Sequence, residues 1–295
     1  MDGNGLWKGL AGLGTDCEEK TCTVAGPYDD LYIYLLEGLV KKEDESFLGS
    51  AFLGNWVEED TSFLFFSKPS ADALSRLLKM RPGLEVIEDH HFAYDQGQGG
   101  GLKPLKVDDF IIVPYWERVE VSEKEIKIIL DPGVVFGNGL HPTTRDCLRA
   151  LAFAGRQRPF DRVLDLGTGT GILAVAAALL GAKKVLAVDL NPLCVRTANE
   201  NVRLNDLNGI IRVVEGTAED FVDETADIVI ANIHQEIIER LLGKKGFHKK
   251  NRLIISGLMR SQYRDVRAQL EKYDFRIVHE WDHDMTWYTI LAETI

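Results

Sequence analysis

Three polar side chains in the C-terminal half of the chain occupy positions from which a nucleoside could be bound. Asp165 closes a predicted strand and opens the loop D-L-G-T-G-T-G, Asp189 ends the next predicted strand, and Asn232 ends a later one. Glycines in such a loop allow a tight turn and let a ligand approach the backbone closely. A carboxylate about 20 residues beyond the first glycine can accept both hydroxyls of a ribose. The amide of Asn232 could accept a hydrogen bond from an incoming amine, although asparagine is also a common turn residue.

The spacing of the glycines favours one cofactor class over another. A dinucleotide site has the pattern G-x-G-x-x-G and places a pyrophosphate on the helix N-terminus, whereas residues 167–171, the glycine loop, read G-T-G-T-G. An acid just before the loop disfavours a pyrophosphate and suits the cationic amino-acid end of S-adenosylmethionine. An ordinary strand-to-helix turn and a nicotinamide site are the alternatives. We predict S-adenosylmethionine as the cofactor, with contacts from Asp165, Gly167, Thr168, Gly169 and Asp189.

A further cofactor contact is expected at Ala218, which follows the predicted strand I-R-V-V-E-G. A small side chain there would lie against an adenine ring, with a polar neighbour near the amino group of the ring. The same residues fit a helix N-terminus equally well, with Thr217 as its cap and Glu219 and Asp220 in its first turn. Both interpretations can hold together.

A segment of small residues, D-P-G-V-V-F-G-N-G-L-H-P-T-T, precedes the glycine loop and is called the strap (residues 131–144). In a methyltransferase of this arrangement, the segment before the first core helix lies over the cofactor. We therefore expect its second part, F-G-N-G-L-H-P-T-T (residues 136–144), to cross the methionine end of the cofactor. Gly137 and Gly139 would permit the close approach, and Pro142 suits the first turn of a helix.

The end of the strap, H-P-T-T, holds three candidate functional side chains. Thr143 or Thr144 could cap the helix that follows and could also reach the carboxylate of the cofactor. His141 could assist proton removal from an amine or could make a structural hydrogen bond. The candidate catalytic residues are therefore His141 and Asn232.

The order of the predicted elements indicates an α/β fold for the C-terminal part. Strand-like apolar runs alternate with amphipathic helices from Arg145 to the end, which favours a mostly parallel sheet covered on both faces. The ligand of such a sheet binds at the C-terminal ends of the strands. The predicted strands are residues 162–167, 184–190, 211–216, 226–233, 252–258, 274–281 and 287–293.

The rest of the chain divides into three parts. Residues 1–27 are rich in Gly, Asp and Thr, and we expect them to be loosely ordered. Residues 28–95 read as a strand, a strand pair, a helix capped by Ser70 and a further strand, which together predict a small α+β domain. Residues 96–130 are interpreted as a linker with connecting strands, and residues 131–295 as the main domain.

Composition and charge limit the function classes. The chain has 295 residues and a formal net charge of −12, which argues against direct nucleic-acid binding and permits a basic protein partner. It has no apolar run of the ~20 residues that span a bilayer and no recognisable signal peptide, so we expect a cytoplasmic protein without membrane contact. Cys17, Cys22, Cys147 and Cys194 form no C-x-x-C pair, which predicts free thiols and no metal site, with a Cys17–Cys22 disulfide as the alternative.

Several segments together resemble one known family. DPGVVFGNGLHPTT, VLDLGTGTGILAVAAALLGA, VDLNP, ANI and SGL, in this order, are similar to PrmA, the methyltransferase family of ribosomal protein L-eleven. The family usually has F-G-T-G-T-H-P-T-T in the strap, and this chain departs from it at Asn138 and Leu140. The resemblance implies a Rossmann-like, seven-stranded class I S-adenosylmethionine-dependent methyltransferase domain and a small ferredoxin-like N-terminal domain. The cofactor contacts that it implies are Thr144, Gly167, Asp189 and Asn232.

The resemblance also implies a reaction and a partner. The reaction is N-methylation of lysine side chains and of an N-terminal amine on a basic ribosomal protein, which the N-terminal domain recognises. The family's tryptophan-rich stretch before the linker is replaced here by H-H-F-A-Y-D-Q-G-Q-G-G-G. The alternatives are a lysine methyltransferase of another protein, a small-molecule methyltransferase, a nicotinamide-dependent oxidoreductase and a non-catalytic binding protein. We expect a monomer.

Overall fold

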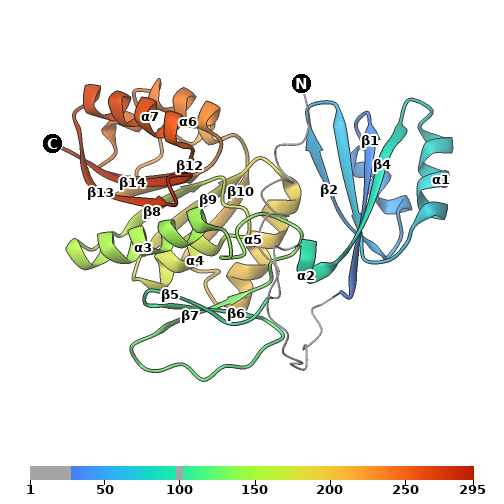
Figure 1. The fold of residues 1–295 in the computed structure, drawn as a ribbon, viewed down its shortest axis with the longest axis horizontal. Coiled ribbons are helices and arrows are strands. Elements are labelled where there is room, and N and C mark those ends of the chain that lie inside the picture. The colour runs from blue at the N-terminus through green and yellow to red at the C-terminus, as the bar shows by residue number, and fades with distance from the viewer. Residues whose placement is uncertain (1–27, 98–101) are drawn as a thin grey trace. The chain divides into compact units, whose positions relative to one another are not determined.

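The chain folds into two units in the computed structural model, which describes residues 28–97 and 102–295. Unit 1 is Met1–Lys103 and unit 2 is Pro104–Ile295 (Figure 1), and each is described by itself. The expectation for residues 1–27, with the possible pairing of Cys17 and Cys22, lies outside the described residues.

Unit 1 contains a four-stranded antiparallel sheet with helical segments between its strands. The strand order is β2-β3-β1-β4, and every neighbouring pair is antiparallel. This order, with one helical crossover between β1 and β2 and another between β3 and β4, is the ferredoxin-like arrangement that the resemblance implied. The elements in chain order are β1 (Asp30–Glu37), the 3₁₀ segment η1 (Lys42–Phe47), β2 (Phe52–Glu58), β3 (Thr61–Phe66), α1 (Ala71–Met80), β4 (Glu85–Ala93) and α2 (Tyr94–Gly97).

Helix α1 closes the core of unit 1. Its apolar face packs on the sheet, because Ala73, Leu74 and Leu77 are buried in the same core as Leu36, Leu64 and Phe66. Ser70 stands at the N-cap position, but its hydroxyl donates to the carbonyl of Lys68 and makes no bond to the first turn. The prediction that Ser70 caps the helix through its side chain is therefore wrong.

Unit 2 is built on a seven-stranded sheet of order β10-β9-β8-β11-β12-β14-β13. The five strands from β10 to β12 are parallel, and β14 is antiparallel to both β12 and β13. The direction of the strand order reverses between β8 and β11, which places a ligand at their C-terminal ends. The strands are β8 (Arg162–Leu166), β9 (Lys184–Asp189), β10 (Ile211–Glu215), β11 (Ile228–Asn232), β12 (Arg252–Leu258), β13 (Phe275–His283) and β14 (Trp287–Thr294).

Two apolar cores cover the two faces of this sheet. Successive residues of one strand alternate between them: Ile228 and Ile230 join the core on one side, and Val229 joins the core on the other. This alternation confirms the prediction of a sheet buried on both faces. One core includes α3 (Pro142–Gln157), α4 (Ile172–Leu179) and α5 (Pro192–Leu204), and the other includes α6 (Gln235–Leu242) and α7 (Arg260–Lys272), with short 3₁₀ segments η2 (Ala218–Asp220) and η3 (Phe247–Lys249) in the connections.

A small second sheet in unit 2 precedes the strap. Its strands are β5 (Leu105–Val107), β6 (Phe110–Pro114) and β7 (Ile126–Leu130), with β5 antiparallel and β7 parallel to β6. Val107, Phe110 and Ile128 are buried in the same core as α3 and α4. The connecting strands that we expected within residues 96–130 therefore fold with unit 2.

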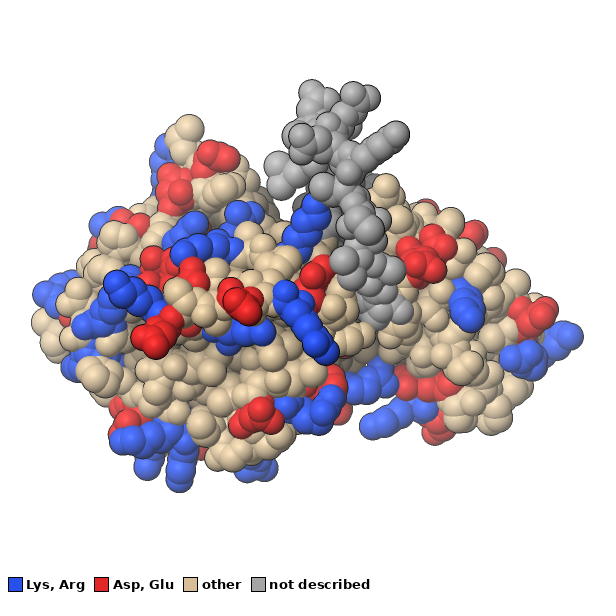
Figure 2. All heavy atoms as spheres, turned by 90° about the horizontal axis from the view of Figure 1, so that it is seen from below, with Lys and Arg blue, Asp and Glu red and all other residues tan. Residues whose placement is uncertain are grey.

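The net charge is distributed unevenly between the units. Residues 1–103 contain 18 Asp and Glu against 9 Lys and Arg, and residues 104–295 contain 28 against 25. Unit 1 therefore carries most of the net charge of −12. On the face seen in Figure 2, basic and acidic side chains are interspersed, so this face presents no field of one sign.

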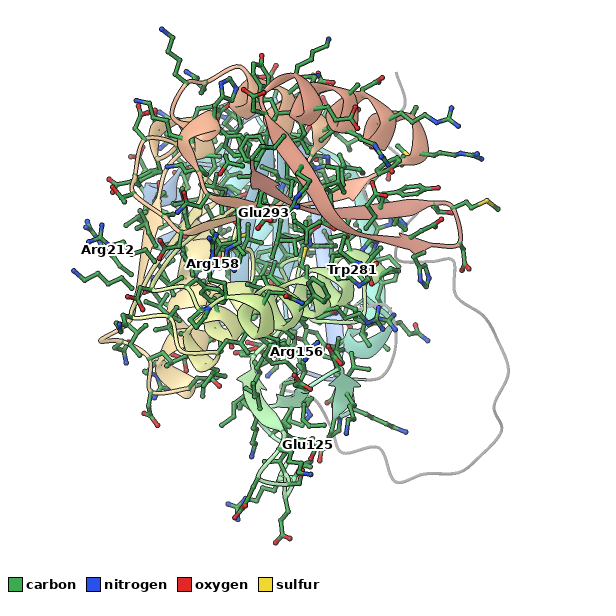
Figure 3. The ribbon with its side chains drawn as sticks, turned by 90° about the vertical axis from the view of Figure 1, so that its left-hand side faces the viewer. Glu125, Arg156, Arg158, Arg212, Trp281 and Glu293 are labelled. Atoms are coloured by element: carbon green, nitrogen blue, oxygen red, sulfur yellow. The ribbon has the colours of Figure 1, made fainter. Side chains whose placement is uncertain are left out.

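A shallow hollow in unit 2 lies between the C-terminal end of α3 and strands β13 and β14, where Figure 3 labels Arg158 and Glu293. The buried guanidinium of Arg252 forms its floor and donates to the carbonyls of Ala154, Arg158 and Pro159. The carbonyl of Ala154 also accepts from the N–H of Arg158 at the end of α3, and the carbonyls of Arg158 and Pro159 follow the helix. The hollow therefore contains an arginine that binds the chain at the end of α3, and it lies away from the C-terminal ends of β8, β9 and β11.

Candidate functional site

The glycine loop turns sharply after β8 and is held by β9. The backbone N–H groups of Gly167 and Thr168 both donate to the carbonyl of Val188, at 2.8 and 3.0 Å. The next N–H, of Gly169, donates to Oδ2 of Asp189 at 2.9 Å. The structure thus brings together the loop glycines and the carboxylate that the sequence singled out. Gly167 and Gly169 have φ angles of +71° and +55°, which non-glycine residues rarely adopt.

The strap lies directly on the glycine loop. The N–H of Thr170 donates to the carbonyl of Phe136 at 3.0 Å, and its hydroxyl donates to the carbonyl of Gly137 at 2.7 Å. A Cβ atom at Gly169 would lie less than 3.0 Å from the carbonyl oxygen of Phe136. Thr170 was not among the predicted site residues, although its hydroxyl in G-T-G-T-G was a visible signal.

Gly169→Ala is expected to lower the affinity for S-adenosylmethionine about tenfold or more, which corresponds to ~1.4 kcal/mol. The new methyl group would press against the strap backbone and force the strap away from the loop. The matched control is Gly181→Ala, because Gly181 also has a positive φ, of +105°, but a Cβ there would meet no atom within 4 Å. Calorimetric titration measures the affinity of both variants, and thermal unfolding measures their stability. Together they separate the steric clash with the strap, which only Gly169→Ala has, from the backbone strain that both variants share. Equal affinity in the two variants would contradict the contact.

Asp165 is a buried carboxyl with one oxygen available. Its Oδ2 accepts a hydrogen bond from the Thr168 hydroxyl at 2.5 Å, and its Oδ1 has no hydrogen-bond partner among the described residues. Burial raises the pKa of Asp165 to about 7, and the charge of Asp189 adds to this effect, while the Thr168 hydroxyl and the backbone N–H of Ala174 oppose it. An approaching cation would satisfy the orphan oxygen and favour the ionised form.

Asp189 organises the backbone around it. Its Oδ1 accepts from the N–H of Asn191 at 2.9 Å, and Asn191 in turn caps α5 by accepting from Leu193. Burial raises the pKa of Asp189, while the N–H groups of Asn191 and Gly169 act in the opposite direction. The carboxylate therefore joins the glycine loop to the start of α5 and stands at the C-terminal end of β9.

The N-terminus of α3 departs from the sequence expectation. Pro142 occupies the first turn as predicted, but the cap is His141, whose Nδ1 accepts from the N–H of Thr143 and lies 2.7 Å from its hydroxyl. The prediction that Thr143 or Thr144 caps the helix is therefore wrong. Burial lowers the pKa of His141 to about 4, with further contributions from the positive charges of Arg145 and His283. Such a neutral imidazole is a weak base at pH 7, and this geometry favours the structural alternative.

Thr144 follows in the first turn of α3 and is 1% exposed. Its hydroxyl has no hydrogen-bond partner among the described residues. A helix N-terminus attracts anions because its first N–H groups lack intrahelical partners. A buried hydroxyl at that position is suited to donate to a carboxylate.

Asn232 ends β11, beside Ser256 of β12. The following residue, Ile233, lies close to the glycine loop. A Cβ atom added at Gly167 would lie less than 3.0 Å from the side chain of Ile233. Gly257 has a φ of +83°, and a Cβ at that position would lie 3.4 Å from Oδ1 of Asn232. Gly257 was not among the predicted site residues. Because it has no side chain, it leaves space beside the amide of Asn232.

Ala218 lies in η2, after β10. The N–H of Gly216 donates to the carbonyl of Asp189 at 3.0 Å, which ties this turn to the end of β9. Thr217 makes no side-chain cap, so that part of the helix interpretation is wrong. Glu219 pairs with Arg240 of α6 at 2.6 Å, and Ala218 itself is half-buried against the core.

Residues 28–97 and 102–295 contain no group of three or more His, Cys, Asp or Glu side chains placed to hold a metal ion. Cys147 and Cys194 are free thiols and are buried. In the same ranges, no helix has the length and apolarity that crossing a bilayer requires.

Comparisons with known proteins agree with this geometry. Residues 74–294 match the family model described as "Ribosomal protein L11 methyltransferase (PrmA)". A ribosomal protein L11 methyltransferase of Geobacillus kaustophilus is 44% identical over 64% of this chain and 61% of its own length, and one of Clostridium botulinum is 42% identical over 65% and 61%. The match thus spans about three fifths of these relatives.

A solved structure supports the fold independently. The crystal structure of a ribosomal protein L11 methylase from Lactobacillus delbrueckii subsp. bulgaricus is 31% identical, with a TM-score of 0.59. The similarity covers 66% of this chain and 100% of that one. The Rossmann-like, seven-stranded α/β fold that the sequence predicted is confirmed.

Proposed function

This chain belongs to the ribosomal protein L11 methyltransferase (PrmA) family, and on that premise we propose that it methylates amines of ribosomal protein L11 with S-adenosylmethionine. The observation that carries the proposal is a pair of buried oxygens without partners among the described residues, Oδ1 of Asp165 and Oγ1 of Thr144. They match the two charged groups at the amino-acid end of S-adenosylmethionine. The pyrophosphate of a dinucleotide would offer no donor to the free oxygen of Asp165, and its negative charge would be repelled by this carboxylate.

The residues of the site fit the cofactor along its whole length. Asp165 would accept from the ammonium group, and Thr144 with the N-terminus of α3 would donate to the carboxylate. Asp189 would accept from the ribose hydroxyls with its remaining lone pairs, and Ala218 would pack on the adenine. Gly167, Thr168 and Gly169 would let the ligand approach the loop backbone.

The bound cofactor supplies an electrophilic methyl group on a sulfonium, whose leaving thioether is neutral. The protein therefore has little charge to stabilise, and alignment is its main contribution, for which effective molarity can supply ~7–11 kcal/mol. Asn232 would accept a hydrogen bond from the acceptor amine and so aim its lone pair at the methyl group. His141, with a pKa of about 4, is too weak a base to remove a proton from an ammonium group. The amine must be neutral when it attacks, so it must lose its proton without help from His141.

Unit 1 is proposed as the part that recognises the protein substrate. Positions 1–103 contain 18 acidic and 9 basic residues. The negative net charge of this unit attracts a basic partner. We propose that the protein acts as a monomer in the cytoplasm, where ribosomal proteins are available.

The experiment that tests the function is mass spectrometry of purified ribosomal protein L11 after incubation with this protein and isotope-labelled cofactor. Methylated lysine or N-terminal peptides are expected. A lysate of the same cell, treated in parallel, identifies any other methylated protein. Labelled protein other than ribosomal protein L11 would support the alternative of another protein substrate, and binding of a nicotinamide dinucleotide in place of S-adenosylmethionine would overturn the proposal.

Cofactor affinity is expected to fall as the pH decreases from about 7 to about 5.5, by up to about tenfold per pH unit. Burial raises the pKa of Asp165 to about 7, so this group gains a proton over that range. The bound ammonium group favours the carboxylate, and binding at acidic pH must displace the proton. Calorimetry in two buffers of different ionisation enthalpy measures that release. In Asp165→Asn the affinity should be lower and should depend on pH much less, because only Asp189, whose pKa burial also raises, still titrates in the site; an unchanged slope would contradict the assignment.

A further inference from the structure

Helix α5 presents two asparagines, one turn apart, to the outer edge of strand β7. Oδ1 of Asn205 accepts from the N–H of Ile129 at 2.9 Å, and its Nδ2 donates to the carbonyl of Ile129 at 2.7 Å. Asn201 repeats this pairing two residues along, accepting from the N–H of Asp131 at 2.6 Å and donating to its carbonyl at 2.8 Å. Alternate residues of a strand point their backbone groups to the same edge. The two amides therefore replace a neighbouring strand and lead the chain into the strap.

Asn201 makes one more bond, and it reaches the glycine loop. Its Nδ2 also donates to the carbonyl of Thr170 at 2.8 Å, and the side chain is 0% exposed. Thr170 holds the strap farther along, through its bonds to Phe136 and Gly137. A closed ring of bonds thus runs from Asp131 through Asn201 and Thr170 to Gly137. The strap is fixed at its beginning and at its middle by one buried amide and one loop residue.

The same face of α5 packs tightly enough to make this ring specific. A Cβ at Gly171 would lie 3.0 Å from the Cβ of Ala198, and a Cβ at Gly133 would lie 3.1 Å from the side chain of Thr197. The glycines of the loop and of the strap both allow the helix to approach. A buried amide whose donors and acceptor are all used is costly to replace, because each lost bond leaves a buried backbone group unsatisfied.

We propose that Asn201 is a positioning residue, which fixes the strap against the glycine loop and thereby sets the affinity for the amino-acid end of the cofactor without touching it. The cofactor part of this inference rests on the proposed function. Asn205 provides a matched control, because its side chain bonds Ile129 and the carbonyl of Asn201 but has no bond to the glycine loop among the described residues.

The test compares Asn201→Ala, Asn201→Ser and Asn205→Ala in the full chain. Hydrogen–deuterium exchange of the free proteins is measured first, because it requires no ligand. In the Asn201 variants, peptides containing Phe136 to Thr144 and Thr170 are expected to exchange at least about fivefold faster than in wild type. In Asn205→Ala, faster exchange is expected at β7 alone. Equal exchange of the strap in the two sets of variants would overturn the inference, whether or not the protein binds S-adenosylmethionine.

Ligand binding then separates positioning from general loss of structure. S-adenosylhomocysteine carries the amino-acid end, and methylthioadenosine lacks it. Asn201→Ser is expected to weaken the first at least about fivefold more than the second, which is in the range of ordinary coupling between sites. A merely structural role would weaken both ligands alike, and this outcome would also overturn the inference. If the wild-type protein bound neither ligand, the proposed function would fail, and the exchange result would still decide the role of Asn201 in holding the strap.

Discussion

A protein consisting of residues 104–295 is expected to bind S-adenosylmethionine as the full chain does, yet to methylate ribosomal protein L11 at least about 100-fold more slowly. The seven-stranded sheet, its two cores and all proposed cofactor contacts lie within unit 2. Unit 1 has its own core and contributes none of these residues. Removing it deletes the proposed recognition surface and the high local concentration of substrate that such a surface provides.

The measurement pairs calorimetry with the initial rate of methyl transfer at subsaturating protein substrate. A chain that starts at residue 131 is the informative comparison, since it also lacks β5 to β7. Val107, Phe110 and Ile128 are buried in the core of unit 2, so this shorter chain should unfold at a lower temperature and bind the cofactor less well. Full-rate methylation by residues 104–295 would remove unit 1 from substrate recognition.

Sequence patterns predicted the large sheet well because its strands satisfy a local rule. Runs such as V-L-A-V-D and I-V-I-A-N are mostly apolar and end in a polar residue, Asp189 or Asn232, at the ligand edge. The short strand β5 was missed, since three residues, Leu105–Val107, carry no periodic signal and form a strand only by pairing with β6. The boundary of unit 2 was placed too late for the same reason. The burial of β6 and β7 in one core with α3 and α4 depends on contacts between segments that are distant in the sequence, which local patterns do not show.

The candidate site shows the same division between local and distant information. Asp165, the loop glycines and Asp189 could be predicted to lie together because their spacing follows directly from strand, turn and helix geometry. Thr170 and Asn201 were missed because their partners are backbone groups 33 and 70 residues away in the sequence. The cap at His141 was misassigned, since hydroxyl residues usually cap helices. Here Nδ1 of His141 accepts from the N–H of Thr143 in place of a hydroxyl, and the hydroxyl of Thr143 lies within hydrogen-bond distance of the same nitrogen.

Asn232→Ala is expected to lower the turnover number about 100-fold, because even a 1 Å misplacement of the reacting groups costs this much. The amide stands at the C-terminal end of β11, beside Ser256 of β12. Loss of the acceptor would leave the amine free to rotate away from the methyl group. The affinity for S-adenosylmethionine should change far less than turnover. Single-turnover kinetics at saturating cofactor, with calorimetry of the same variant, measure the two effects separately.

Two further variants test whether the effect comes from the amide of Asn232 itself. Asn232→Asp keeps an acceptor oxygen but adds a negative charge, which favours the ammonium form of the amine and so removes its lone pair. Its rate should therefore be low at neutral pH and should recover as the pH rises, whereas the rate of Asn232→Ala should stay low. Asn199→Ala is the control, since Asn199 is exposed on α5 and its amide bonds the carbonyl of Val195. If Asn232→Ala turned over at the rate of Asn199→Ala, amine alignment would have to come from another group.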